Sequence, residues 1–355
     1  MRVARNLLSI AAMAAAALGI MALVLISLDF SATGDAGHAR AESRPDVMAP
    51  ASDAGLGTRG PILDDQRPFP IEGLYGGDDD ADAADEASPV APPKVPPAAT
   101  PVDTSARFVA VYDVSLGRFN LGNFSISGTV QNGQYNLRGN GSFSVLKGWV
   151  FNWKGSMDGS GLATTDGPNP NSYSFSQSDG KYNERLRIFF GDGFVKSVKI
   201  WPKPRPYPGE IPVRKEQVQH VVDPLSGAFL MARSDNPHGD LSVCNQLIPV
   251  FDGRSRFDLV LKPKKRVRVQ NRGGDNYSGP AAVCKVKFVP ISGYPRGDPG
   301  IEQLRQANDI EAWMVPLRGT NMYVPYRIVM PTSVGYGTAV VTSLRVGRPG
   351  RAKAH

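Results

Sequence analysis

The two cysteines are the residues with the clearest potential chemistry. Cys244 and Cys284 are the only thiols in 355 residues, and both follow an apolar N-terminal segment that is typical of exported proteins. Oxidising compartments convert such pairs to disulfides, whereas a redox-active pair usually has a CxxC spacing, which this chain lacks. We therefore predict a structural disulfide, which restricts the unfolded chain by about 4 kcal/mol in the chain-entropy model.

Basic side chains are concentrated between residues 254 and 272. They alternate with apolar residues on both sides of Pro263, which predicts a hairpin that turns at Pro263 and carries a cationic outer face. Such a face would attract anionic lipid headgroups, lipopolysaccharide phosphates or acidic wall polymer. The alternative is a solvated face that protects a sheet edge from aggregation. The predicted anionic-ligand patch consists of Arg256, Lys262, Lys264, Lys265, Arg266, Arg268 and Arg272.

Residues for catalysis are scarce. The sequence contains no GxSxG, HExxH, P-loop or GxGxxG motif, and its two cysteines and four histidines are too few for a zinc finger, an iron–sulfur protein or a haem-attachment protein. His220 and His238 are the only imidazoles within the predicted folded region, and Asp252 with Asp258 is a weak carboxylate pair. We expect a non-enzymatic protein with no catalytic residues, no cofactor and no metal.

The N-terminus predicts export. Arg2 and Arg5 precede an apolar stretch from Leu7 to Leu28, which as a helix covers about 33 Å, enough to cross a bilayer. That length favours a retained signal anchor, whereas Ala39-Arg40-Ala41 fits the cleavage site of a signal peptide. Both alternatives for residues 1–28 stay open, and in both the chain after residue 30 is exported.

Residues 29–105 form an acidic, proline-rich linker. They contain 15 Asp and Glu against 5 Lys and Arg, together with 11 prolines. This composition cannot bury enough apolar surface to offset the entropy of ordering, so we predict disorder. The alternative is an acidic arm that folds back on the rest of the chain or docks a partner. Residues 106–355 hold 33 basic and 18 acidic residues, so the basic character belongs to the part predicted to fold.

Residues 106–346 show short alternating apolar and polar stretches separated by Gly, Asn, Asp and Pro, which predicts an all-β, mainly antiparallel fold. About a dozen strands suit one large curled sheet or open β-barrel, and Asn132-Gly133 predicts a tight hairpin turn. The final residues, 347–355, form a basic tail that we expect to be disordered. The predicted strands include residues 108–116, 124–130, 194–200, 257–261, 283–289, 310–317, 323–330 and 338–346.

One short helix is predicted within this β region. Asp223 can cap its first turn and Pro224 suits its first helical position. Leu225, Ala228, Phe229 and Ala232 then follow at helical spacing. We expect this helix to plug or cover one face of the sheet.

Four groups of residues resemble the family of the domain of unknown function 3108. They are Asp223-Pro224-Leu225-Ser226, Val250-Phe251-Asp252-Gly253-Arg254-Ser255-Arg256-Phe257, Tyr277-Ser278-Gly279-Pro280 with Cys284, and Tyr323-Val324-Pro325-Tyr326-Arg327. The resemblance implies an exported envelope protein of a Gram-negative bacterium with a β-rich periplasmic domain and no established activity. The protein would then be anchored in the inner membrane or released after signal cleavage. The family-like positions are Asp223, Pro224, Phe251, Asp252, Gly253, Arg254, Pro325 and Tyr326.

The function expected from these features is a non-enzymatic role in maintaining the cell envelope or binding one of its components. One alternative is a barrel that carries a lipid or other apolar ligand behind Phe257, Leu259 and Val286. A second is an envelope hydrolase with an unrecognised site. The expected partners are the membrane, through an uncleaved N-terminal helix, and an anionic envelope lipid or polymer. Export argues against nucleic acid, and the oligomeric state is left open.

Overall fold

A computed structural model describes residues 105–145, 151–204, 208–232, 240–270, 277–318, 320–332 and 335–347. The predicted export segment, the acidic linker and the basic tail lie outside these ranges, as do His238 and Arg272. No helix among the described residues combines the length and the apolar character that a bilayer crossing requires.

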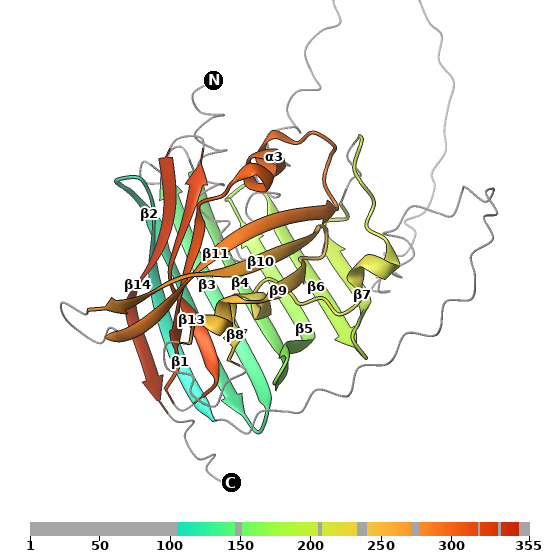
Figure 1. Ribbon diagram of the computed structural model, residues 1–355. Coiled ribbons are helices and arrows are strands. Elements are labelled where there is room, and N and C mark those ends of the chain that lie inside the picture. Colours follow the sequence, from blue (N-terminus) through green and yellow to red (C-terminus); the bar gives the residue numbers. More distant parts are fainter. Residues whose placement is uncertain are drawn as a thin grey trace, which may run out of the picture.

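The described chain folds into one antiparallel sheet of fourteen strands (Figure 1). The hydrogen-bonded order is β7-β6-β5-β4-β3-β2-β1-β14-β13-β12-β11-β10-β9, and β8 pairs with β13 off this path. The all-β, mainly antiparallel prediction is therefore confirmed, and the sheet is open. The strands are β1 (Ala106–Leu116), β2 (Phe119–Gln131), β3 (Gln134–Val145), β4 (Phe151–Thr164), β5 (Gly167–Ser178), β6 (Asn183–Gly191), β7 (Phe194–Trp201), β8 (Leu230–Met231), β9 (Leu247–Phe251), β10 (Arg256–Val269), β11 (Gly279–Ser292), β12 (Ile310–Pro316), β13 (Met322–Thr332) and β14 (Gly335–Gly347).

The strands form where residues that can be buried alternate with residues that can stay accessible. In β1, the buried side chains of Phe108, Ala110 and Tyr112 alternate with more accessible ones, as a strand with one face in the core requires. The predicted turn after β2 is confirmed, since Asn132 and Gly133 have φ angles of 53° and 71°. Two successive positive φ angles fit the right-handed twist of a tight hairpin.

The sheet curls so that its two ends face each other. Figure 1 shows the long β10 and β11 pair crossing the run of strands β2 to β6 at a steep angle. Between them lies the segment 221–232, every residue of which is buried. We call this segment the plug. The ring of Phe229 in the plug lies 5.4 Å from that of Phe108 on β1, so the plug packs against the inner face of the sheet.

The plug is not the helix that the sequence predicts, and that prediction is wrong. It contains one 3-10 turn, η4 (Ser226–Ala228), and then extends into β8. The Asp223 carboxylate does accept hydrogen bonds from the Leu225 and Ser226 amides, at 3.0 and 2.9 Å. Beyond that turn the backbone pairs with β13 instead. Because all its residues are buried, the segment has no solvated face of the kind an amphipathic helix needs.

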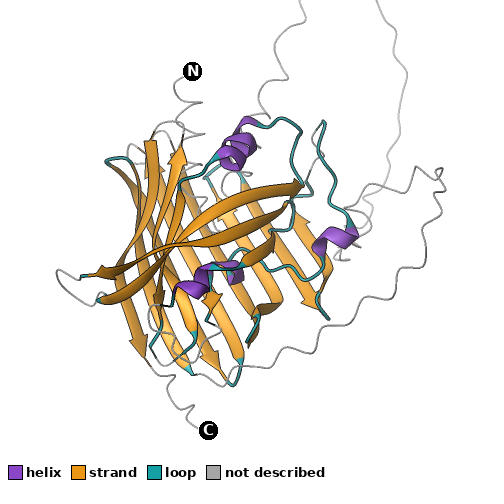
Figure 2. Ribbon diagram, viewed as in Figure 1, coloured by secondary structure: helices purple, strands orange, loops and turns teal. Residues whose placement is uncertain are grey.

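The described part of the chain has one α-helix, α3 (Pro299–Gln306), and the sequence analysis missed it. Its first turn has the same Asp-Pro signal, because the Asp298 carboxylate accepts a 2.8 Å hydrogen bond from the Ile301 amide. Leu304 is its buried apolar contact. Figure 2 shows α3 and the 3-10 turns as short segments beside the strands.

A short stretch of chain links the two open edges of the sheet. Gln219 bridges to Phe194 on β7, and Val222 bridges to Val250 on β9. The backbone amide of Val222 donates to the Pro249 carbonyl at 2.8 Å, and the Phe251 amide donates back to the Val222 carbonyl at 2.9 Å. The ladder is therefore interrupted between β7 and β9, and the chain entering the plug spans that interruption.

Candidate functional site

The basic residues of the predicted patch lie on one strand. β10 runs without a turn from Arg256 to Val269, so the predicted hairpin at Pro263 is wrong. Pro263 lies opposite Cys284, and the register shifts before Lys265, which leaves Lys264 as an extra residue. A bulge tolerates proline because the missing N–H is not needed in the ladder there. The strand can therefore continue through a residue that usually ends one.

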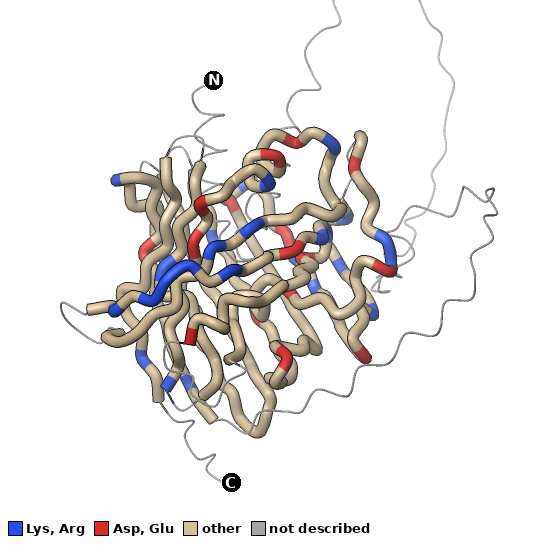
Figure 3. Tube along the Cα trace, viewed as in Figure 1, with Lys and Arg blue, Asp and Glu red and all other residues tan. Residues whose placement is uncertain are grey.

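The bulge changes how β10 presents its side chains. Before it, Phe257, Leu259 and Leu261 are buried and alternate with more accessible residues. From Lys262 onward, five successive residues are exposed, and Arg268 is exposed as well. Figure 3 shows the resulting run of basic residues along this strand. We call the following exposed residues the cationic ridge: Lys262, Lys264, Lys265, Arg266 and Arg268 of β10, with Lys285 of β11.

Acidic neighbours neutralise little of the ridge. Lys264 forms an ion pair with Glu311 on β12. Burial alone would raise the pKa of Glu311, but hydrogen bonds from Lys264 and Trp313 hold that pKa below its usual value. Within the described residues, the other five cations of the ridge have no ion pair. Lys262 even lies directly opposite Lys285 in the ladder, an arrangement of like charges that destabilises a sheet.

Arg256 and Arg272 do not join the ridge. The Arg256 side chain is 11% exposed, and its guanidinium pairs with Asp258 at 2.6 Å and donates to the Gln217 carbonyl at 2.7 Å. It therefore ties β10 to the 3-10 turn η3 (Lys215–Val218). Arg272 lies outside the described residues.

The predicted disulfide is present and lies at the base of the ridge. Cys244, at the end of the 3-10 turn η5 (Leu241–Cys244), is bonded to Cys284 with a Cα–Cα distance of 5.1 Å. Both cysteines are fully buried, Val286 and Phe288 are also buried, and Lys285 is exposed. Cys284 therefore points toward the core, on the side of β11 away from Lys285. Because Cys284 pairs with Pro263, the crosslink fixes β11 directly beside the bulge.

An arginine and a tryptophan lie in a row of residues that crosses the sheet beside the ridge. The sequence analysis assigned neither of them to the site. The register joins Lys265 to Val283, Val283 to Trp313, and Trp313 to Arg327. The Arg327 guanidinium lies over the Trp313 ring, 5.3 Å from its centroid, and its Nε is buried without a hydrogen-bond partner among the described residues. The alternation of residues along β12 and β13 is enough to predict that both side chains face outward. Only the strand register shows that they lie in one row with Lys265.

Asp223 and Asp252 belong to two family-like motifs that meet in the interior. The bridge between Val222 and Val250 brings them close, and the carboxylates are 0% and 1% exposed. Burial raises the pKa of each to about 6, although hydrogen bonds favour the charged forms. Burial, followed by the charges of both carboxylates, also raises the pKa of the Tyr173 phenol. Both carboxylates accept hydrogen bonds from the backbone amides of tight turns.

The other family-like positions also serve the packing. Gly253 has φ +98°, and a Cβ there would lie 2.4 Å from Leu186 on β6. Arg254 pairs with the buried Glu184 at 3.0 Å. Pro224 is a buried residue of the plug, and Phe251 is a buried residue at the end of β9. On β13, the Pro325 carbonyl accepts a 2.8 Å hydrogen bond from Tyr112, and the Tyr326 ring lies 6.3 Å from that of Tyr277.

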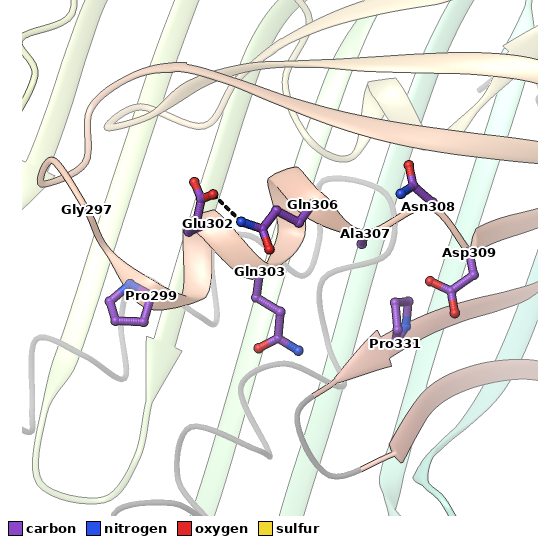
Figure 4. A pocket seen from close by; sticks show the side chains of 9 residues that line it. All are labelled: Gly297, Pro299, Glu302, Gln303, Gln306, Ala307, Asn308, Asp309 and Pro331. Carbon is purple, nitrogen blue, oxygen red and sulfur yellow. Dashed lines mark hydrogen bonds between the residues drawn. The ribbon is translucent and has the colours of Figure 1, made fainter.

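A shallow pocket lies beside α3, and Figure 4 shows its polar lining. Glu302 accepts hydrogen bonds from Arg305 and Gln306, and Asp309 accepts one from Tyr336 at 2.8 Å. The two carboxylates that line the pocket therefore already accept hydrogen bonds from neighbouring side chains. Among the described residues, no cluster of His, Cys, Asp and Glu is suited to hold a metal ion.

The comparison with known protein families agrees with the family resemblance. The family described as a protein of unknown function (DUF3108) matches residues 111–342. Among curated proteins, none matches the chain. A similar solved structure is a β-barrel-like protein of the domain of unknown function DUF1849 from Brucella abortus. It is 10% identical, with a TM-score of 0.38, and the match covers 69% of this chain and 98% of that one. Because the family match spans well over half of its length, the chain belongs to the DUF3108 family.

Proposed function

We propose that this domain binds a phosphate-bearing anionic component of the cell envelope through the cationic ridge, and that it helps to maintain the envelope without catalysing a reaction. The observation that carries the proposal is the set of five exposed cations on β10 and β11 that form no ion pair with any residue the structure describes. Phosphate groups occur both on anionic phospholipids and on lipopolysaccharide. Both are attracted to clustered Lys and Arg side chains.

The opposed lysines support a binding role over a merely solvated edge. A face that only has to stay soluble can mix both signs of charge, as Arg138 with Asp158 and Arg305 with Glu302 do elsewhere on this surface. Like charges directly opposite in a ladder cost up to about 1 kcal/mol relative to neutral pairs. An anionic ligand would relieve that repulsion.

The interior gives less support to the carrier alternative. Phe257, Leu259 and Val286, which would line a ligand cavity, are buried, and the Phe257 and Phe288 rings lie 5.1 Å apart. The plug already lies between the layers of the sheet. A lipid in that position would have to displace buried side chains such as Leu225 and Phe229.

The test compares two variants of the full-length chain held in neutral phosphatidylcholine nanodiscs. The ridge variant replaces Lys262, Lys265, Arg266 and Arg268 with Ser, and the control replaces the exposed Arg107, Lys154, Arg185 and Arg187 with Ser. Binding to lipopolysaccharide and to phosphatidylglycerol vesicles is measured separately, which distinguishes the two sources of phosphate. Because each basic residue near an anionic surface contributes about 1 kcal/mol, we expect the ridge variant to lose affinity at least about tenfold for one of the two. Equal losses in both variants would contradict a specific role for the ridge.

A further inference from the structure

We infer that an acidic run of this same chain, residues 78–86, folds back on the cationic ridge and competes with the anionic ligand. This regulatory contact rests on the proposed function, because both partners would occupy the same surface. Within those nine residues the chain has six acids and no Lys, Arg or Pro. The members of the acidic run are Asp78, Asp79, Asp80, Asp82, Asp85 and Glu86.

The charges of the two segments are complementary. The ridge has six cations and one paired acid, Glu311, while the acidic run has six carboxylates. The rest of the linker has its acids more widely spaced, with at most two in succession, Asp64 and Asp65. The acidic run therefore has the highest density of negative charge in the linker.

The register gives the distance that the chain must cover. Lys265, Val283, Trp313, Arg327, Val340 and Asp113 form one continuous row from β10 to β1. Five strand spacings cover about 24 Å, and the seven residues from Asp113 back to Ala106 cover about 23 Å. The path from the start of β1 to Lys265 over the sheet is thus about 33 Å. β10 and β1 run in opposite directions, so residues after Lys265 on β10 lie closer to the start of β1. By the same count, Arg268 lies about 27 Å from Ala106.

The acidic run lies at a matching distance along the chain. It precedes Ala106 by 20 to 28 residues, and the random-coil relation gives such a segment a root-mean-square span of about 22–32 Å. The effective concentration of a tethered group is highest when this span matches the distance to its site. The acids between residues 35 and 53 have a larger span of about 36–51 Å by the same relation, so their effective concentration at the ridge is lower. Asp64 and Asp65 are closer but supply only two charges.

The contact would be reversible. Exposed ion pairs are individually weak and are screened by salt, so the acidic run occupies the ridge only part of the time. A surface with denser negative charge would displace it. The ridge would then respond to the density of anionic groups more steeply than a permanently open site, because the ligand must first compete with the chain.

The first readout needs no ligand. The full-length chain in neutral nanodiscs is treated with a zero-length carbodiimide crosslinker at about 50 and 500 mM NaCl, and the crosslinked peptides are identified by mass spectrometry. We expect Lys262, Lys264, Lys265 or Lys285 to be linked to acids of the acidic run at low salt, with strong loss at high salt. Absence of these links at low salt, or equal linking to acids between residues 35 and 65, would overturn the inference.

The second readout measures competition. One variant neutralises the acidic run with Asp→Asn changes and Glu86→Gln, and the matched control neutralises Asp35, Glu42, Asp46, Asp53, Asp64 and Asp65 in the same way. If the acidic run covers the ridge about four-fifths of the time, its neutralisation increases the apparent affinity for phosphatidylglycerol vesicles about fivefold. The control should change less than twofold, and the ridge variant should show no increase in affinity when the acidic run is neutralised.

The outcomes separate the two proposals. Ridge-dependent binding that neutralisation leaves unchanged would overturn the inference while the proposed function stands. Equal strengthening in both linker variants would also overturn it, because the effect would then depend on net charge alone. If neither vesicles nor lipopolysaccharide bind, the proposed function fails, and the salt-sensitive crosslinks alone decide whether the acidic run contacts the ridge.

Discussion

Asp223 and Asp252 link the stability of the domain to pH at the scale of single residues. Burial raises the pKa of each from 3.8 to about 6. The folded state therefore binds protons more tightly than the unfolded chain does. The corresponding stability is fully present below about pH 4 and is lost as the pH rises through about 6. This is the reverse of the usual behaviour of salt-bridged carboxylates.

We predict that the free energy of unfolding increases by about 1 to 1.5 kcal/mol per aspartate when the pH falls from about 7.5 to about 5. Denaturant unfolding across this range measures the change. Asp252→Asn should remove about half of it, because the amide keeps an oxygen acceptor for the Arg254 and Ser255 amides. Asp166→Asn, at an exposed turn, should leave the pH dependence intact. A flat profile in the unmodified chain would refute this prediction.

The disulfide gives a second prediction for single residues. Cys284→Ser should lower the free energy of unfolding by about 2–5 kcal/mol, the usual range for loss of a native disulfide. The double change Cys244→Ser with Cys284→Ser is the control, and it should destabilise to a similar extent, since either change alone removes the crosslink. Chemical unfolding under non-reducing conditions provides the measurement. Unfolding that reducing agent does not affect would count against a structural bridge.

At the scale of elements, the eight predicted ranges coincide with eight of the fourteen observed strands, while β3, β4, β5, β6, β8 and β9 have no such range. The stretches 108–116 and 194–200 lie within observed strands, because one buried face is visible in the local pattern. The plug escaped prediction because its backbone partners, β13 and β9, are supplied by the tertiary fold. The predicted hairpin at Pro263 was wrong for a similar reason. The strand continues through Pro263 only because a bulge forms opposite Cys284.

The turn between β9 and β10 gives a prediction at this scale. Gly253→Ala should destabilise the domain by about 1–3 kcal/mol, because alanine is strained at φ +98° and its Cβ would lie 2.4 Å from Leu186. Gly180→Ala is the matched control, with φ +92° and open space around the added Cβ. Thermal unfolding of both variants separates the clash from the backbone strain. Equal effects would show that the contact with Leu186 does not matter.

At the scale of the whole molecule, the curled sheet holds one basic strand in front of a filled interior. The sequence predicted the basic residues of the ridge, because their alternation and density are local properties. It could not predict that Arg256 is sequestered by Asp258 and the chain of η3, or that Lys285, Trp313 and Arg327 lie beside the ridge. Those relations depend on strand register, and a bulge of one residue changes which side chains face each other.

The salt dependence of ligand binding tests the central claim most directly. Affinity of the full-length chain in neutral nanodiscs for phosphatidylglycerol vesicles and for lipopolysaccharide is measured from about 50 to 300 mM NaCl, for the unmodified chain and for the ridge variant. We predict that the affinity falls at least about tenfold over this range, because exposed charges are screened beyond about 8–10 Å at physiological ionic strength. The ridge variant should bind more weakly with a shallower slope and an almost unchanged melting temperature. Binding that is independent of salt and survives in the ridge variant would contradict the account and favour an apolar ligand held inside the sheet.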